Sequence, residues 1–410
     1  MSTTILAIGL MIFFAHFLSL QFHKTNIPDV LILILIGILI GPVLGIVTPA
    51  DFGKVGPLIA TIAIVVILFE SGTSLNLTTL GESLGMTGFL SLLCFLLSSA
   101  IVTGVALIAL DLTLLPAIML GVTLGGTSSA VVIPIVNSLK MTEKLGTVLV
   151  LESALTDVLC IVGVFALLQI HTQGNVEPGR LVGGVLSALI FAAVIGVVGG
   201  IGWLLVLGKV RNFPNTISST LAYVFIVFGL TELLGFSGAI ASLALGITLT
   251  NFEKFGLHRL QHLDQQIEPL NEMDITFYRE AVFLLKTYFF VYLGISILFG
   301  SVKIAIVAIE MTLLMYIMRL ILTRVALQSD TYNLRDSSIT SMMIPKGLAA
   351  AVLAGLPMQY GVTGGEIIRE ITYIVVLTSI SFTAILVALY QRPAVQQFYS
   401  SFLKKPVKSD

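Results

Sequence analysis

The chain has few charged residues for its length. Asp, Glu, Lys and Arg make up 10% of its 410 residues, whereas a typical soluble domain has about 25%. Hydrophobic residues make up 57%, so the composition excludes an ordinary soluble protein and indicates one that lies in a lipid bilayer. The net charge is only −1, without the excess of Lys and Arg that a nucleic-acid partner requires.

Cysteine is also scarce. Cys94 and Cys160 are the only two, and both lie inside apolar runs without the spacing of metal ligands. We therefore expect neither a disulfide nor a metal centre, and we predict two small buried hydrophobic side chains. The sequence has no His-Glu-x-x-His motif and no Gly-x-Gly-Asp or Tyr-Asp pair, so we expect a protein without cofactors that is not an enzyme.

Long apolar runs fill most of the sequence. About 20 apolar residues are needed to cross a hydrocarbon core of about 30 Å. The first run, residues 4–22, lacks the basic start and the cleavage site of a signal peptide, so we expect it to remain as a span. The sequence predicts an all-α polytopic membrane protein of about thirteen spans, near residues 4–22, 29–48, 56–72, 85–110, 114–137, 145–170, 180–208, 217–234, 237–252, 277–300, 302–324, 337–357 and 366–390.

The basic residues predict the orientation of these spans. Short cytoplasmic loops collect Lys and Arg. Most such residues fall in the odd-numbered loops and the C-terminus, whereas the even-numbered loops hold only Lys54, Arg180, Lys303 and Arg369. We therefore expect the N-terminus outside and the C-terminus in the cytoplasm. The polar stretch from Asn251 to Glu280 is expected to be an amphipathic cytoplasmic helix.

Few ionisable residues fall inside the predicted spans. Each such group costs roughly several kcal/mol unless it is paired or hydrated, so each suggests a function. Some lie close enough to a span end to reach water, namely Glu70, Lys286 and Glu310. Four remain at depth, and these are Glu152, Asp157, Arg319 and Lys346.

The sixth predicted span carries two carboxylates. Glu152 and Thr156 are four residues apart, as are Ser153 and Asp157, so we expect all four side chains to line one cavity. Asp157 is predicted near the bilayer midplane, about 20 Å along the helix from its cytoplasmic end. Burial disfavours the charged form of a lone carboxylate, so Asp157 can hold either a proton or a hard cation near neutral pH. The alternative is a purely structural carboxylate, which suits Glu152 better.

Two spans are predicted to be interrupted. Residues 124–130 read Leu-Gly-Gly-Thr-Ser-Ser-Ala, and residues 343–348 read Met-Ile-Pro-Lys-Gly-Leu. Paired glycines weaken a helix, and proline removes a helix hydrogen bond. Two broken spans at matching places indicate two inverted repeats of six helices with an ion site at their interface. These would be spans one to six and eight to thirteen; a Pro-Gly kink that serves only packing is the alternative.

Two buried cations complete the candidate site. Arg319 is predicted at a depth similar to that of Glu152, and we expect the two to pair because an unpaired buried carboxylate is costly. The alternative is that Arg319 extends alone to the membrane surface. Lys346, at the second break, is expected to offset the carbonyl dipoles of the facing half-helices rather than to anchor the helix at the interface.

Two motifs resemble those of the cation/proton antiporter superfamily, especially its NhaP-like sodium/proton exchangers. Residues 68–72, Leu-Phe-Glu-Ser-Gly, resemble the family's Leu-Phe-Glu-Gly-Gly segment. Residues 152–157, Glu-Ser-Ala-Leu-Thr-Asp, resemble its Glu-Ser-x-x-Asn-Asp motif except at Thr156. The resemblance implies the NhaA-like antiporter fold and a homodimer in a prokaryotic inner membrane, in which a six-helix core carries the ion past a fixed dimerisation domain.

The resemblance also implies roles for individual residues. Asp157 would bind the cation or the proton, with Ser153 and the Thr127 backbone as further ligands of the transported Na⁺ or K⁺. Thr156, Ser128 and Glu152 would belong to the same cation- and proton-binding group. Glu152 would organise the core with Arg319 as its partner, and Lys346 would compensate charge.

The same resemblance implies a division of the chain. Residues 1–112 would hold dimerisation helices one to three and the first core helix. The remaining parts would be the core at 113–171, the linker helix seven and dimerisation helices eight to ten at 172–300, core helices eleven to thirteen at 301–391, and a short cytoplasmic tail at 392–410.

The transported cation is left open. Na⁺ is the first expectation, with Li⁺ as a congener. Thr127-Ser128 stands where the NhaP kind has Thr-Asp, and residues 128–131 and 345–347 resemble the branch that contains potassium-efflux proteins, so K⁺ is the alternative. One titrating carboxylate predicts one-for-one, electroneutral exchange with H⁺. A channel would need a continuous row of carbonyls or a ring of charges, and the sequence predicts neither.

Overall fold

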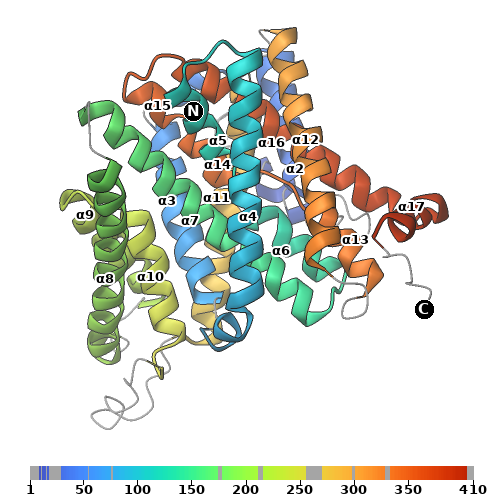
Figure 1. Cartoon of the computed structure of the whole chain (residues 1–410). Helices are drawn as coiled ribbons and strands as arrows, with labels where there is room; N and C mark the ends of the chain where they lie inside the picture. The colour runs from blue at the N-terminus through green and yellow to red at the C-terminus, as the bar shows by residue number, and fades with distance from the viewer. Residues whose placement is uncertain are drawn as a thin grey trace. The chain divides into compact units, whose positions relative to one another are not determined.

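The computed structural model describes the chain in several stretches, which consist of helices and the turns and loops that join them. The described residues are 9–10, 12–14, 16–17, 29–53, 55–74, 77–173, 178–210, 216–254, 270–297, 301–327 and 333–403, and none of them forms a strand. The α-helices are α2 (Asp29–Ile38), α3 (Val55–Ser74), α4 (Leu77–Ala109), α5 (Leu114–Thr123), α6 (Ser129–Ser138), α7 (Glu143–Gln173), α8 (Pro178–Val210), α9 (Ser219–Leu233), α10 (Gly238–Thr250), α11 (Glu272–Ser296), α12 (Val302–Ala326), α13 (Leu334–Met342), α14 (Leu348–Leu353), α15 (Leu356–Gln359), α16 (Gly365–Leu389) and α17 (Pro393–Leu403) (Figure 1).

The chain divides into two compact units. The first contains residues 1–53, 85–172 and 290–410, and therefore holds α2, most of α4, α5 to α7 and α12 to α17. The second contains residues 54–84 and 173–289, and holds α3, α8 to α10 and most of α11. Every residue of the candidate site belongs to the first unit, which we call the core unit.

Five of the described helices are long and apolar enough to cross a bilayer. They are Ser91–Ala109, Leu145–Thr172, Ile190–Leu207, Val302–Ala326 and Gly365–Leu389. Shorter apolar helices occupy most of the other predicted spans, including α2, α9 and α10. The predicted first span, 4–22, lies largely outside the described residues.

The polar stretch between α10 and α11 differs from its prediction. Residues 255–269 lie outside the described residues. From Glu272 onward the chain already belongs to α11. Residues 272–280 therefore begin this long helix instead of ending the expected amphipathic helix. The local reason is a reciprocal cap, since the Asn271 N–H donates to Asp274 Oδ2 at 3.1 Å and the Asp274 N–H donates to Asn271 Oδ1 at 2.7 Å. Such a cap starts a helix at this position.

The residues after α16 also differ from expectation, because they form a docked helix rather than a simple tail. In α17, Pro393 occupies the first helical position, which suits its fixed φ. Tyr399 and Leu403 are buried. The Tyr399 hydroxyl bonds to the hydroxyl of Tyr316 on α12, and the Arg324 guanidinium of α12 lies 5.0 Å from the Phe402 ring centre.

Two helix crossings are made by facing glycines. In the core unit, Gly37 of α2 meets Gly294 of α11, and in the second unit Gly72 of α3 meets Gly246 of α10. At each of the four glycines an added Cβ would collide with the carbonyl oxygen of the residue three positions before the partner glycine. Those residues are Val291, Ile34, Leu243 and Phe69. Helix backbones approach this closely only where side chains are absent, as in the small-residue crossings of membrane helices.

Candidate functional site

The first predicted helix break lies between α5 and α6. The helix stops at Thr123, residues 124–128 are not helical, and α6 starts at Ser129. Gly125 and Gly126 stand in this gap, and both are enclosed. A Cβ on Gly126 would meet the Cys160 sulfur and the Thr156 carbonyl of α7. The glycines therefore end the helix and also let its backbone lie directly on α7.

The second break crosses the first. Between α13 and α14 residues 343–347 are not helical, and the Ser128 N–H donates to the Pro345 carbonyl at 2.7 Å. Gly347 packs on Ser128 so closely that any Cβ would collide with the Ser128 hydroxyl. The two interrupted spans, predicted separately, thus meet backbone to backbone.

Lys346 places its charge at the crossing. Its side chain is 2% exposed, and its ammonium donates to the Gly126 carbonyl at 2.8 Å. The Lys346 N–H, freed by the break, donates to the Ser379 hydroxyl of α16 at 3.0 Å. The ammonium therefore contacts a backbone carbonyl of the break between α5 and α6, and its charge-compensating role stays a prediction.

Asp157 faces the same crossing from α7. Its Oδ2 accepts from the Ser129 hydroxyl, at the first residue of α6, at 3.1 Å, and the Lys346 ammonium attracts it electrostatically. Its neighbours Ser153 and Thr156 are 0% exposed, whereas Asp157 itself is only partly buried. Asp157 is therefore the carboxylate that the described part of the chain places at the crossing.

The polar groups next to Asp157 hold the broken backbone in position. The Thr127 N–H donates to the Thr156 hydroxyl at 3.1 Å, and the Gly126 N–H donates to the Cys160 sulfur at 3.1 Å. The Thr156 hydroxyl donates to the Ser153 carbonyl at 3.2 Å. The Ser153 hydroxyl donates to the Val150 carbonyl at 2.9 Å, within its own helix.

Glu152 and Arg319 form the predicted ion pair. Both side chains are 1% exposed. Arg319 Nη1 bonds to Glu152 Oε1, and Arg319 Nη2 donates to Glu152 Oε2 at 2.7 Å, which is the bidentate geometry of a strong pair. The remaining guanidinium donors reach the Thr340 carbonyl at 3.2 Å and the Cys94 sulfur at 3.2 Å. The pair thus connects α7, α12, α13 and α4.

The four polar residues of α7 do not share one environment, so the prediction of a single cavity lined by all of them needs correction. Glu152 lies against Arg319, whereas Asp157 lies against Ser129. Residues five positions apart on an α-helix are about 140° apart around its axis, which separates these two carboxylates. The prediction considered only the pairs four residues apart, Glu152 with Thr156 and Ser153 with Asp157, and so overlooked the angle between Glu152 and Asp157.

Three residues of this region were not predicted as parts of the site. Ser129 bonds to Asp157, Cys160 accepts from Gly126, and Cys94 accepts from Arg319. Both cysteines are buried and free, as predicted, but they also serve as hydrogen-bond acceptors. Cys160 follows Thr156 by four positions, so the helix-face argument could have found it.

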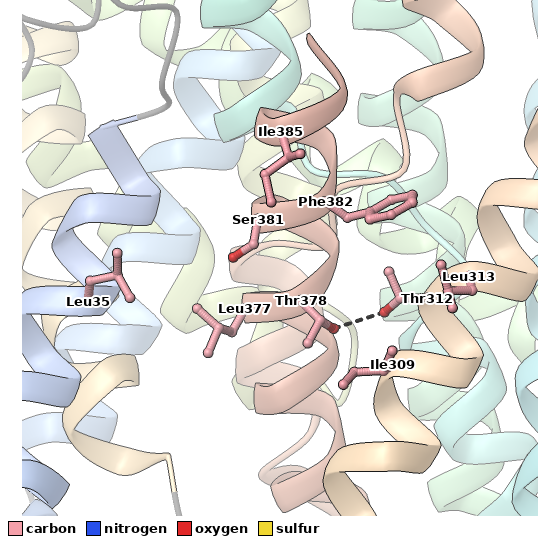
Figure 2. Close-up of a pocket in the computed structure, with 9 residues that line it drawn as sticks. All are labelled: Leu35, Ile309, Thr312, Leu313, Leu377, Thr378, Ser381, Phe382 and Ile385. Atoms are coloured by element: carbon pink, nitrogen blue, oxygen red, sulfur yellow. Dashed lines mark hydrogen bonds between the residues drawn. The ribbon is translucent and has the colours of Figure 1, made fainter. Parts of the chain in front are cut away.

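The core unit also has two apolar grooves that do not suit an ion. One, of about 330 Å³, lies between α2, α12 and α16, and Figure 2 shows its hydroxyl pair Thr312 and Thr378, 2.9 Å apart. The other, of about 570 Å³, lies between α4 and α12 and is lined by residues such as Ile101 and Met318. Neither lining includes a charged side chain, so the candidate site stays at the crossing.

One sequence pattern could suggest a hydrolase. Residues 81–85, Gly-Glu-Ser-Leu-Gly, have the spacing of a Gly-x-Ser-x-Gly nucleophile elbow. A nucleophile elbow is a sharp turn from a strand into a helix, whereas these residues lie inside the continuous helix α4. The pattern therefore carries no sign of this chemistry.

Gly347 should be intolerant of any side chain. Gly347→Ala would place a Cβ against the Ser128 side chain and push the two broken segments apart, so we expect the melting temperature to fall strongly. The control is Gly355→Ala, where the nearest atom to an added Cβ is 3.5 Å away, an ordinary contact. Thermal unfolding of both variants in detergent measures this, and equal melting temperatures would contradict it.

Comparison with known proteins gives consistent results. The family described as "Sodium/hydrogen exchanger, transmembrane" matches residues 9–390. The chain is 26% identical over 302 residues to the Na(+)/H(+) antiporter NhaS2 of Synechocystis sp.. This alignment covers 72% of this chain and 53% of that protein. The chain is 22% identical over 367 residues to the K(+)/H(+) antiporter NhaP2 of Shewanella sp., which covers 87% and 61%. The alignments with these two relatives therefore cover between about half and three fifths of their length.

A solved structure agrees in fold. The sodium proton antiporter MjNhaP1 from Methanocaldococcus jannaschii superposes with a TM-score of 0.72 over 93% of this chain and 99% of that chain, at 19% identity. The likeness at this identity concerns the fold. Because the family match covers nearly the whole chain, the predicted kinship with cation/proton antiporters is confirmed, and the chain belongs to the sodium/hydrogen exchanger family.

Proposed function

We propose that this chain is a secondary antiporter that exchanges a monovalent cation for H⁺ through Asp157. The observation that carries the proposal is the position of this carboxylate, which is partly buried, lies within a spanning helix and faces the crossing of two helix breaks. A carboxylate can hold either a proton or a cation, so the two compete for one site. Competition at one site is what exchange requires.

The neighbouring groups supply the rest of the proposed ion site. The cation would bind Asp157 together with oxygens of Ser153 and the Thr127 backbone, with Thr156 and Ser128 beside them. Thr127 suits this role because its N–H is fixed by Thr156 at 3.1 Å, which holds the peptide in place. The Lys346 ammonium donates a hydrogen bond to the Gly126 carbonyl. Its positive charge would stabilise the site when Asp157 is ionised and no cation is bound.

The glycine crossings support a pair of inverted repeats. Gly37 lies eight residues after the first residue of α2, and Gly246 lies eight residues after the first residue of α10. The repeats would pair α2 with α10 and α3 with α11, so that the Gly37–Gly294 and Gly246–Gly72 crossings correspond. Their matching contacts with carbonyl oxygens support this relation and, with it, the thirteen-span arrangement.

The transport mechanism would be of the elevator type in a homodimer. The site, both breaks and the Glu152–Arg319 pair all belong to the core unit, which favours movement of the site with its surrounding helices. The implied core segments 113–171 and 301–391 lie wholly in this unit, and most of the implied segment 172–300 lies in the other. Residues 1–112 would supply dimerisation helices and the first core helix, with 392–410 as the cytoplasmic tail.

Na⁺ is the proposed substrate, with K⁺ as the alternative. The relatives include one named for Na⁺ and one named for K⁺, so they do not select between the two. With a single titrating carboxylate at the crossing, exchange should be one for one and electroneutral. The orientation proposed for a plasma membrane is N-terminus outside and C-terminus inside.

A flux assay in proteoliposomes tests the proposal. Na⁺, Li⁺, K⁺ and Rb⁺ are supplied in turn to vesicles with an internal pH dye, across a series of external pH values. We expect proton movement with a bell-shaped pH profile, because low pH keeps the site protonated and high pH removes the proton to be exchanged. Cation flux without proton movement would favour a channel, and charge movement at saturating cation would contradict electroneutral exchange.

A further inference from the structure

A polar cavity lies at one end of the core unit, away from the contacts of the Asp157 site. Its volume is about 520 Å³. The last turns of α6 and α16 and the first turns of α13 and α17 contribute to it. We call it the basic cavity, and its lining residues are Ser138, Leu139, Lys140, Arg335, Ile339, Val387, Tyr390, Gln391 and Gln396.

The basic cavity is rich in hydrogen-bond donors. Lys140 and Arg335 bring two positive charges from separate elements, and no Asp or Glu is among the lining residues. Gln391 and Gln396 add amide donors, and Tyr390 adds a hydroxyl. Like charges that converge in one cavity repel each other, so a negative group between them would be stabilised by both.

Helix dipoles explain only part of this arrangement. The C-terminal ends of α6 and α16 attract cations, and Arg335 Nη2 donates to the Leu139 carbonyl at 2.8 Å. A guanidinium has five N–H donors, so this bond leaves most of its donors for another acceptor. Both Lys140 and Arg335 are exposed.

The place of the cavity in the fold suits a group at the membrane surface. Its apolar wall is formed by Ile339 and Val387, and Val387 still belongs to the spanning helix Gly365–Leu389. Its polar wall is formed by residues just beyond that helix, such as Gln391. Because Gly365–Leu389 is long and apolar enough to cross a bilayer, we expect the cavity at the boundary between hydrocarbon and water, which is the depth of lipid headgroup phosphates.

We propose that the basic cavity binds a phosphate-bearing anion, either the headgroup of an anionic phospholipid or a soluble phosphate compound. Lys140 and Arg335 would pair with the phosphate oxygens, and the glutamines would donate further hydrogen bonds. The site is distinct from the proposed ion site and does not depend on which cation is moved. The proposed topology adds only that it faces the cytoplasmic leaflet.

Binding there should hold the two broken spans together. Lys140 lies two residues after the end of α6, and Arg335 belongs to α13, so a bound phosphate would bridge the outer halves of both breaks. The same place already has two bridges, because Asp336 Oδ2 accepts from the Thr142 N–H at 2.9 Å and Arg335 Nη2 donates to the Leu139 carbonyl at 2.8 Å. A further bridge by the ligand should raise the melting temperature of the protein.

The test measures thermal unfolding of the purified full-length protein in a neutral detergent. The added probes are dioctanoyl phosphatidylglycerol, dioctanoyl phosphatidylcholine and inorganic phosphate. A rise in melting temperature with phosphatidylglycerol alone identifies a lipid headgroup, and a rise with inorganic phosphate identifies a soluble compound. The proposal would be overturned if neither phosphatidylglycerol nor inorganic phosphate raised the melting temperature. It would also be overturned if both lipids raised it equally and inorganic phosphate did not.

Variants assign the effect to the cavity. The double variant Lys140→Gln/Arg335→Gln should lose the rise, whereas Lys140→Arg/Arg335→Lys should keep most of it. The control Lys209→Gln/Lys303→Gln removes two exposed cations elsewhere and should behave like wild type. Native mass spectrometry of bound lipid gives a second readout if a variant melts early. An unchanged response in the Gln double variant would also overturn the proposal.

Discussion

Asp157→Asn is expected to reduce cation-dependent proton exchange to the rate of empty vesicles. Asn keeps the size of the side chain and can still accept the bond from the Ser129 hydroxyl, so the crossing of the two breaks should persist. It cannot take up a proton or carry a negative charge, and therefore it cannot alternate between the two ligands. The bell-shaped pH profile should disappear with the flux, and the measurement is pH-dye fluorescence in proteoliposomes.

The control separates loss of transport from loss of fold. Asp111→Asn changes the same chemical group at an exposed position, where φ is +53°, and Asn tolerates this region well. It should transport like wild type. Asp157→Asn should keep its melting temperature in the absence of cation but lose the stabilisation that added Na⁺ gives to wild type. Cation-dependent pH gradients at the native rate in Asp157→Asn would refute the mechanism.

The sequence contained enough information to find the helix breaks. Gly125 and Gly126 cannot hold a helix well, and Pro345 removes a helix hydrogen bond, so both interruptions were predictable from local chemistry. The pairing of Glu152 with Arg319 was predictable from their similar predicted depth in the membrane and from the free-energy cost of an unpaired buried carboxylate. Few other ionisable groups were available as partners. These features depend on residue type and on position along one span.

Features that depend on tertiary contacts could not be predicted in the same way. That Lys346 reaches the Gly126 carbonyl, or that Cys94 accepts from Arg319, depends on how segments far apart in sequence meet. The helix α17 was missed for a related reason. Its apolar positions, Tyr399 and Leu403, fall in a segment too short to cross a bilayer, so a search for spans ignores them.

Removing one partner of the Glu152–Arg319 pair should be the most destabilising single change among the contacts described for the core unit. Removing one partner leaves a charge that is 1% exposed without its counterion, which costs about 3–5 kcal/mol in other proteins. Arg319→Met should therefore lower the melting temperature sharply. Glu152→Gln should lower it less, because the amide oxygen can still accept one bond from the guanidinium. Melting in detergent measures both.

The double variant tests whether the cost comes from the unpaired charge. Glu152→Met/Arg319→Met removes both charges, so it should be more stable than Arg319→Met alone, and the double-mutant cycle should show a large coupling. It should remain below wild type, because the Thr340 carbonyl also loses its bond from Arg319. The exposed pair Lys303–Asp111, 3.6 Å apart, is the control, and breaking it should have little effect. Additive effects of the two Met substitutions would show that the ion pair does not organise this core.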